Sequence, residues 1–186
     1  LIKVLIGQRR VGKSFLLKQI IDEVLFITKN ANIIFIDKEK YEFDQIQNYH
    51  QLIEFVKSQQ KEGTNYLFID EVQEIKGFEK ALRSLLSDKI FDIYCTGSNA
   101  NMLSTDIATF LSGRQMVFKI YSLSFTEFCQ FHNYKLNTSA LNKYLKYGGL
   151  PYLIHLPKDD SIIFDYLDNI YATILFRDIV SRNEIR

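Results

Sequence analysis

The sequence predicts an α/β fold in which helices cover both faces of a parallel sheet. Short apolar runs rich in β-branched residues alternate with longer stretches whose apolar residues recur at helical spacing. Most of the short runs lack a clean in-out alternation, which is typical of strands buried on both faces. After residue 120 only helical signals follow. We therefore expect an α/β core at residues 1–122 and a helical appendage at residues 123–186.

The expected elements follow from these runs. The expected strands are residues 3–6, 32–36, 66–69, 92–95 and 116–120, and the expected helices of the core are residues 14–27, 45–57 and a third that begins near Phe78. In the appendage, Ser124 and Glu127 have the spacing of a capping box that opens a short helix. Gly148-Gly-Leu-Pro151 should end another helix, and residues 161–179 read as one long amphipathic helix.

Composition sets further limits. The net charge is +1, so no overall field draws the molecule onto nucleic acid or an anionic membrane. Cys95 and Cys129 lack metal-ligand spacing and suit reduced core residues. No apolar run approaches the roughly 20 residues that span a bilayer, so we expect a cytoplasmic protein. The chain begins inside an expected strand without an initiator Met, and we expect it to be part of a longer protein.

The strongest motif occupies residues 7–14. It matches the phosphate-binding loop G-x-x-x-x-G-K-[ST] and stands between an expected strand and an expected helix. Its backbone N–H groups and the helix N-terminus suit phosphate oxygens, Lys13 should reach the β- and γ-phosphates, and Ser14 should ligate Mg²⁺. The alternative is a Gly-rich turn that binds nothing. We expect ATP and Mg²⁺ as cofactors, with the nucleotide held by Gly7, Gln8, Arg9, Arg10, Val11, Gly12, Lys13, Ser14 and Phe15.

A second motif ends the third expected strand in two carboxylates. Asp70 and Glu71 should lie at the carboxyl edge of the sheet, where α/β folds bind ligands. Asp70 would hold Mg²⁺, directly or through water, and Glu71 would accept a proton from the attacking water. A solvated strand end is the alternative. The sequence has no Asn-Lys-x-Asp guanine reader, and a small-molecule kinase needs no such base, so the pair favours ATP hydrolysis.

Further candidates flank the fourth and fifth strands. Ser98 or Asn99 should emerge at the same edge and position the attacking water, although either could instead cap a following helix. Arg114 could supply charge to the transition state, within one subunit or across an interface, or it could be an ordinary surface arginine.

Other polar residues carry weaker signals. Arg9 and Arg10 touch phosphate or a partner, or they point to solvent. Asp37 and Glu39 end the second strand and read more readily as solvated loop acids than as the rim of the site. The three histidines are scattered singly and are given no role.

Taken in order, these motifs resemble the AAA-like predicted ATPases of prokaryotes, a branch of the additional-strand P-loop group close to the STAND signalling ATPases. The resemblance rests on residues 7–14, 67–73, 96–99, 111–114, 123–128 and 148–151. It implies a P-loop NTPase sheet of order 5-1-4-3-2, a small helical lid after it, and often a further C-terminal domain. Gln8 stands where this family often has proline, and the family's segment before the first strand is missing here.

The function expected from these motifs is an ATPase with a mechanical or regulatory output, acting through an unknown protein partner or through self-association. One alternative is a nucleotide-dependent switch with little turnover. Another is a nucleic-acid-associated ATPase, encouraged by Arg9, Arg10, Lys13 and Lys18 but ranked last because the net charge is only +1.

Overall fold

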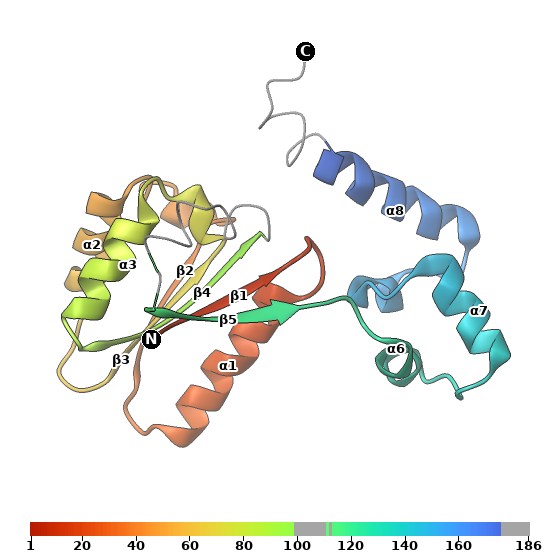
Figure 1. Cartoon of the computed structure of the whole chain (residues 1–186), viewed down its shortest axis with the longest axis horizontal. Coiled ribbons are helices and arrows are strands. Elements are labelled where there is room, and N and C mark those ends of the chain that lie inside the picture. Colours follow the sequence, from red (N-terminus) through yellow and green to blue (C-terminus); the bar gives the residue numbers. More distant parts are fainter. Residues whose placement is uncertain (99–110, 112, 176–186) are drawn as a thin grey trace, which may run out of the picture. The chain divides into compact units, whose positions relative to one another are not determined.

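The structure is a computed structural model that describes residues 1–98, 111 and 113–175 (Figure 1). The chain divides into two compact units. The sheet unit comprises residues 1–7 and 13–120, and the helical unit comprises residues 8–12 and 121–186. This division differs from the expected one, because residues 8–12 of the phosphate-binding loop and residues 121 and 122 group with the helices.

The sheet unit contains all five expected strands, each within a residue or a few of its predicted bounds. They are β1 (Ile2–Gly7), β2 (Asn32–Asp37), β3 (Asn65–Asp70), β4 (Phe91–Ser98) and β5 (Gln115–Ile120). Every neighbouring pair is parallel, and the order is β2-β3-β4-β1-β5 (Figure 1). This confirms the predicted order 5-1-4-3-2, which is the same sheet counted from its other edge.

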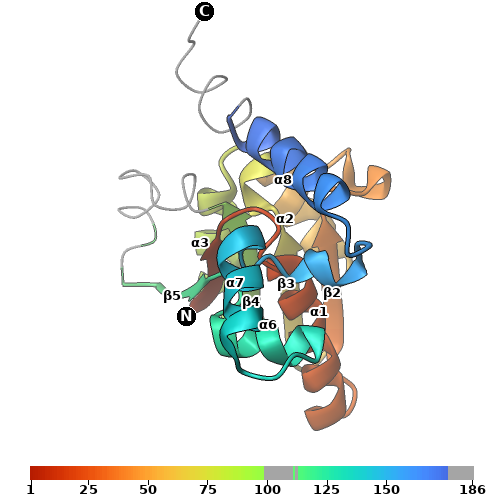
Figure 2. The ribbon, with the colours of Figure 1, turned by 90° about the vertical axis from the view of Figure 1, so that its right-hand side faces the viewer.

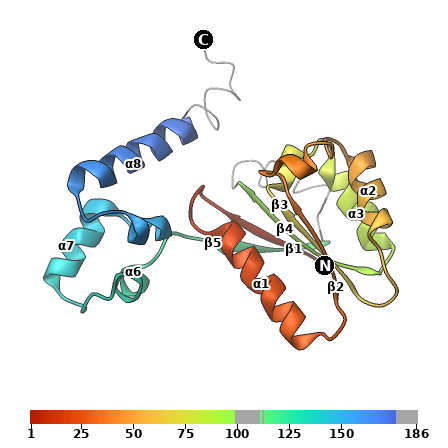
Figure 3. The same cartoon turned by 180° about the vertical axis from the view of Figure 1, so that it is seen from behind.

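Helices cover both faces of the sheet, as the strand composition predicts. Helix α1 (Lys13–Ile27) lies on one face, and helices α2 (Tyr49–Ser58) and α3 (Phe78–Ser87) lie on the other (Figures 1 and 3). Val4 and Ile6 belong to the core beneath α2 and α3, whereas Leu5 belongs to the core beneath α1. Alternate residues of one strand therefore enter two different cores, which explains the missing in-out alternation.

Helix α2 begins at Tyr49, four residues later than predicted. The side chain of Asn48 accepts hydrogen bonds from the backbone N–H groups of His50 and Gln51 and so fixes the first turn there. Ile46 is buried although it precedes the helix. The sequence pattern counted Ile46 as part of the helix because of its apolar side chain, but Ile46 lies in the loop before the helix.

Short helices make up the helical unit. They are α6 (Phe125–His132), α7 (Thr138–Tyr147), the 3₁₀ helix η3 (Pro151–His155) and α8 (Asp160–Ile174) (Figure 2). The predicted capping box is confirmed: the Ser124 hydroxyl accepts from the N–H of Glu127, and the Glu127 carboxylate accepts from the N–H of Ser124. Gly148 ends α7, also as predicted. Residues 176–179 of the last expected helix lie outside the described residues. No helix in the described ranges has the length and apolar character that crossing a membrane requires.

A close backbone contact ties the start of the helical unit to the residues that follow α7. The N–H of Leu123 donates to the carbonyl of Gly149 at 2.7 Å, and the Tyr144 hydroxyl donates to the carbonyl of Leu123 at 2.9 Å. A Cβ atom on Gly149 would lie 2.2 Å from the Leu123 oxygen. Only glycine fits at this position without a shift of the backbone.

Candidate functional site

The carboxyl ends of four parallel strands meet at one edge of the sheet, where several of the predicted site residues of the sheet unit lie. Gly7 at the end of β1 is in register with Ser98 at the end of β4, and Asp37 at the end of β2 is in register with Asp70 at the end of β3. The sequence predicted this edge correctly, because parallel strands place their carboxyl ends together.

Asp70 projects from the face of the sheet that α1 covers. Phe68 and Tyr94 stack beneath α1 with ring centroids 4.8 Å apart. Asp70 and Thr96 follow them by two residues, so their side chains lie on the same face. Helix α1 starts at Lys13, just after the chain leaves the carboxyl end of β1. The first turn of α1 and the Asp70 carboxylate therefore share one face and one edge.

Lys13 is buried, with 5% of its surface exposed. Its ammonium group donates to the carbonyl of Gly7 at 3.2 Å, which keeps the charge at the end of β1. A buried cation needs such oxygen partners because burial removes its hydration. This position also removes Lys13 from the exposed basic patch that had encouraged the nucleic-acid hypothesis.

Thr96 connects the two acidic residues. Its hydroxyl donates to the Asp70 carboxylate and accepts from the backbone N–H of Glu71, the latter at 2.9 Å. Thr96 is fully buried, so one hydroxyl uses both its donor and its acceptor capacity away from water. Thr96 belongs to residues 96–99, one of the stretches that carry the family resemblance, but the sequence analysis gave it no role. The missing signal was the register that places Ile69 beside Cys95 and so sets Asp70 next to Thr96.

Glu71 has a left-handed backbone with φ of 54°. Such a conformation is uncommon for a residue with a side chain, and it costs on the order of 1 kcal/mol or more. The Gln73 amide N–H donates to the Glu71 carboxylate, and the Gln73 amide oxygen is buried with no hydrogen-bond partner among the described residues. Gln73, which sequence reasoning did not assign to the site, thus restrains the carboxylate of Glu71.

Residues 8–12 of the loop have the tight backbone that the motif predicts. Arg10 and Gly12 have φ values of 67° and 98°, and Val11 is buried. These residues pack within the helical unit: a Cβ on Gly12 would meet Pro151 at 4.0 Å. Burial raises the pKa of Tyr166, and the positive charge of Arg10 opposes that rise. Arg10 is therefore electrostatically coupled to α8.

Arg114 does not join the other predicted residues of the sheet unit. Its carbonyl accepts from the N–H of Ile2 at 2.8 Å, at the amino end of β1. The six residues of β1 separate this point from Gly7, which corresponds to about 16 Å at the usual rise per residue. Arg114 is exposed and lines an open hollow with Lys80, Arg83, Ser84 and Ser87. It cannot act at the carboxyl edge of its own sheet.

The remaining predicted residues have mixed outcomes. Phe15 is 67% exposed, and Asn99 lies outside the described residues. The interpretation of Asp37 as a solvated acid is wrong, because it is 7% exposed and its carboxylate accepts from the N–H of Glu39 at 3.1 Å. Glu39 itself is exposed, as expected. The two cysteines are confirmed as free and buried.

This fold, with its phosphate-binding loop and acid-ended third strand, defines an AAA-type P-loop ATPase domain. Two solved structures share the fold. The Saccharomyces cerevisiae Hsp104–ADP complex superposes with a TM-score of 0.59 at 17% identity, over 98% of this chain and 30% of that one. AMPPCP-bound DnaA from Aquifex aeolicus superposes with a TM-score of 0.51 at 15% identity, over 98% of this chain and 58% of that one.

The chain belongs to the AAA domain family, whose model matches residues 1–129. An uncharacterized protein of Haemophilus influenzae is 36% identical over 100% of this chain and 48% of its own length. An uncharacterized protein of Methanocaldococcus jannaschii is 33% identical over 100% of this chain and 43% of its own length. The chain thus spans less than half the length of each of these relatives.

Proposed function

We propose that the chain binds ATP with Mg²⁺ and hydrolyses the γ-phosphate with water. The observation that carries this proposal is the pair formed by Asp70 and Thr96. It lies on the face and edge of the sheet where α1 begins with Lys13 and Ser14. A metal-binding carboxylate, a phosphate-binding ammonium and a helix N-terminus on one edge are the parts that phosphoryl transfer requires.

The oxygen donors at this edge fit Mg²⁺. The Ser14 hydroxyl and the Asp70 carboxylate are hard ligands, and Asp70 keeps a fixed orientation because Thr96 donates to it. Within the described ranges no three His, Cys, Asp or Glu side chains gather into a metal site. Phosphate and water oxygens would complete the coordination, as is usual for Mg²⁺. The ion would neutralise charge that develops on the phosphate oxygens.

The proposed roles of the side chains follow from their positions. Lys13 holds the β- and γ-phosphates, exchanging its bond to the Gly7 carbonyl for phosphate oxygens. Glu71 accepts the proton of the attacking water, and Gln73 restrains its carboxylate. Ser98 and Asn99 remain hypotheses: either could position the water or cap a following helix.

The test is Glu71→Gln, which keeps the size of the side chain but removes its ability to take a proton. Turnover should fall by about 10² to 10⁴, while ATP affinity changes by less than about tenfold. Glu74→Gln is the matched control, because Glu74 is exposed in the same 3₁₀ turn and should keep the parent's rate. If the two variants hydrolyse ATP equally fast, Glu71 is not the base.

A second variant separates the metal ligand from the base. Asp70→Asn should weaken the metal site, so raised Mg²⁺ should partly restore its turnover, whereas Glu71→Gln should not respond. If neither variant lowers a measurable parent rate, the nucleotide-dependent switch becomes the better hypothesis. The acid pair would then serve as a conformational anchor.

We also propose that Arg114 acts across a subunit interface, because it lies at the amino edge of its own sheet. Arg114→Ala keeps its own carboxyl edge, and Glu71→Gln keeps Arg114. Mixing the two inactive variants should therefore restore activity in subunits that combine an intact edge with a neighbour's arginine. A mixture no more active than its separate components would refute this role and the self-association it requires.

We propose that ATP hydrolysis drives a mechanical or regulatory output. The relatives are roughly twice as long as this chain, so a mechanical or regulatory partner could bind their other half. We propose that the helical unit serves as the lid of the ATPase, since residues 8–12 of the phosphate loop group with it. Nucleic acid is not favoured as a partner, because the net charge is +1 and Lys13 is buried.

A further inference from the structure

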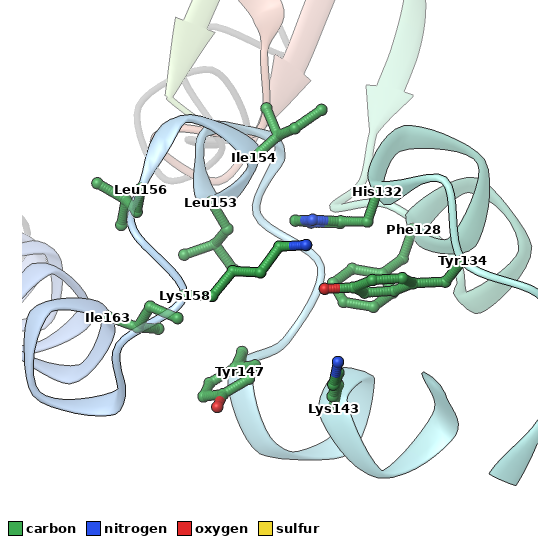
Figure 4. Close-up of a pocket in the computed structure, with 10 residues that line it drawn as sticks. All are labelled: Phe128, His132, Tyr134, Lys143, Tyr147, Leu153, Ile154, Leu156, Lys158 and Ile163. Atoms are coloured by element: carbon green, nitrogen blue, oxygen red, sulfur yellow. The ribbon is translucent and has the colours of Figure 1, made fainter. Parts of the chain in front are cut away.

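The helical unit contains a cavity that the nucleotide chemistry does not use. Its volume is about 130 Å³, close to that of an engineered apolar cavity of about 150 Å³ that binds benzene. One wall is aliphatic, formed by Leu153, Ile154, Leu156 and Ile163 (Figure 4). The opposite wall carries the rings of Phe128, His132 and Tyr134. The interior therefore suits an apolar group no larger than one ring.

Positive charge gathers at this cavity. The ammonium groups of Lys143 and Lys158 lie 4.5 Å and 5.3 Å from the centroid of the same ring, that of Tyr134 (Figure 4). Within the described residues, the helical unit's ion pair joins Lys146 to Asp160, and neither Lys143 nor Lys158 has an acidic partner. Among the described residues, none that lines the cavity is acidic. Two like charges at one ring repel each other, and a bound anion would relieve that repulsion.

His132 adds a polar atom that lacks a partner. Its ring stacks on Tyr134 with an interplanar angle of 13°, and its Nε2 atom is buried with no hydrogen-bond partner in the described part of the chain. Burial lowers the pKa of His132, and the charges of Lys158 and Lys143 lower it further. A buried ring nitrogen without a partner is unfavourable, so a ligand atom that bonded to it would be stabilising.

We propose that this cavity binds a small amphipathic anion, with one ring or short aliphatic group against Leu153 and Ile163 and a carboxylate or phosphate between Lys143, Lys158 and His132. A carboxylate and a phosphate both present oxygen acceptors that the nitrogen atoms of Lys143, Lys158 and His132 can bond. Two ammonium donors and an imidazole nitrogen can each bond an anionic oxygen, and such charge-assisted bonds are stronger than neutral ones. The ring or aliphatic group of the ligand supplies apolar contact that a bare inorganic ion lacks.

The experiment is a calorimetric titration of the full chain with four probes. Benzoate and phenyl phosphate carry both the ring and the charge and should saturate in about the millimolar range. Benzamide keeps the ring without the charge, and inorganic phosphate keeps the charge without the ring. Both should bind at least about tenfold more weakly, the usual effect of losing one charged hydrogen bond or one buried ring. Equal affinities for benzoate and benzamide would overturn the proposal.

Variants tie the binding to this cavity. Lys143→Met and Lys158→Met keep most of the aliphatic stem and remove the charge, and each should weaken benzoate binding about tenfold. Lys135→Met is the matched control, because Lys135 is exposed nearby but does not line the cavity, and it should bind like the parent. If all three variants bind alike, the anion lies elsewhere.

A spectroscopic readout does not depend on affinity alone. A bound anion should raise the pKa of His132, seen as a shift to higher pH in the NMR titration of its ring proton. The other titratable groups that line the cavity are Tyr134, Lys143, Tyr147 and Lys158. Competition with Mg-ATP separates this site from the proposed nucleotide site: benzoate affinity should be unchanged by saturating Mg-ATP. Displacement by Mg-ATP would assign the cavity to the nucleotide and overturn the proposal.

Discussion

The sheet unit and the helical unit are stabilised by different interactions. In the sheet unit, parallel strands pair along their whole lengths and aliphatic side chains such as Ile36, Leu52 and Ile69 have no exposed surface. In the helical unit, one described cluster is Phe128, Cys129 and Ala140, and partly buried residues, most of them aromatic, pack against it. The sheet unit gains its stability from extensive buried apolar area and from hydrogen bonds between parallel strands. The helical unit adds helix caps and a close backbone contact to its smaller buried clusters.

This difference has a consequence for mutation. A core that is spread over many residues tolerates a small local change, because each contact contributes little to the total. A unit whose helices also rely on caps and on a close backbone contact is sensitive at those points. The helical unit should therefore unfold first, in response to single atoms added where its backbones are in close contact.

The largest effect is expected from Gly149→Ala. Its Cβ would lie 2.2 Å from the Leu123 oxygen, so the backbone contact must open, at a cost of roughly 3 kcal/mol. Gly148→Ala is the comparison variant: nothing lies within 4 Å of its Cβ, but its φ of 77° and ψ of −171° lie in a region that is essentially restricted to glycine, so backbone strain alone should cost about 1–3 kcal/mol.

Hydrogen exchange measures where this loss falls. Amides of α7 should lose protection in Gly149→Ala, while those of β3 should keep the parent's protection. If β3 loses protection equally, the two units unfold together and the comparison between them is wrong. A larger loss in Gly148→Ala than in Gly149→Ala would show that backbone strain outweighs the close contact.

A smaller effect is expected in the sheet unit from Thr96→Val. The variant keeps the shape of the side chain, but Asp70 loses a donor and the N–H of Glu71 loses an acceptor, all of them buried or partly buried. Stability should fall by about 2 kcal/mol in urea denaturation, and Thr96→Ser should restore most of it. Turnover should fall more than ATP affinity, because Thr96 orients the two acids and is not expected to touch the nucleotide. Equal losses in kcat and in affinity would contradict a positioning role.

The two units also differ in how well the sequence predicted them. All five strands and the edge that holds Gly7, Asp70 and Ser98 were correct, because runs of apolar residues and the polar residues that end them are local signals. The capping box at Ser124 was correct for the same reason. The strand order came from the resemblance to a family, since nothing local in a strand identifies its neighbours.

What the sequence missed depends on contacts between distant segments. The role of Thr96 and the burial of Asp37 both follow from strand register, which pairs β4 and β2 with β3. Of the alternatives left open for Arg114, action within its own subunit could have been excluded from the sequence, because a residue that precedes a parallel strand lies at the opposite edge. The cavity in the helical unit could not be foreseen, since α6, α7 and η3 each supply part of its lining.

The smallest expected effect is the pH dependence of stability that the buried Cys95 thiol causes, and it measures how well the core of the sheet unit excludes water. Cys95 lies in that core with no exposed surface, and burial raises the pKa of its thiol from 9.0 to about 12. The folded thiol therefore ionises later than the unfolded one. Its contribution to stability is complete below pH 9.0 and is lost as the pH rises from 9.0 toward about 12, by roughly 1 kcal/mol for each pH unit. Burial, with the nearby charge of Asp92, also raises the pKa of Tyr94 to about 12, but from 10.0.

Urea denaturation between pH 8 and pH 10 isolates the thiol, because most of the tyrosine effect begins at higher pH. Cys95→Ala creates a small cavity and lowers stability at every pH, but it removes the titrating group, so its pH dependence should be flatter than the parent's by about 1 kcal/mol over this interval. Tyr94→Phe is the control, and it should keep the parent's slope there. Equal slopes in the parent and in Cys95→Ala would mean that the thiol ionises as readily in the folded state as in the unfolded one. Water would then reach the core beneath α2 and α3, and the contrast between a dry, extensively packed sheet unit and a contact-dependent helical unit would no longer hold.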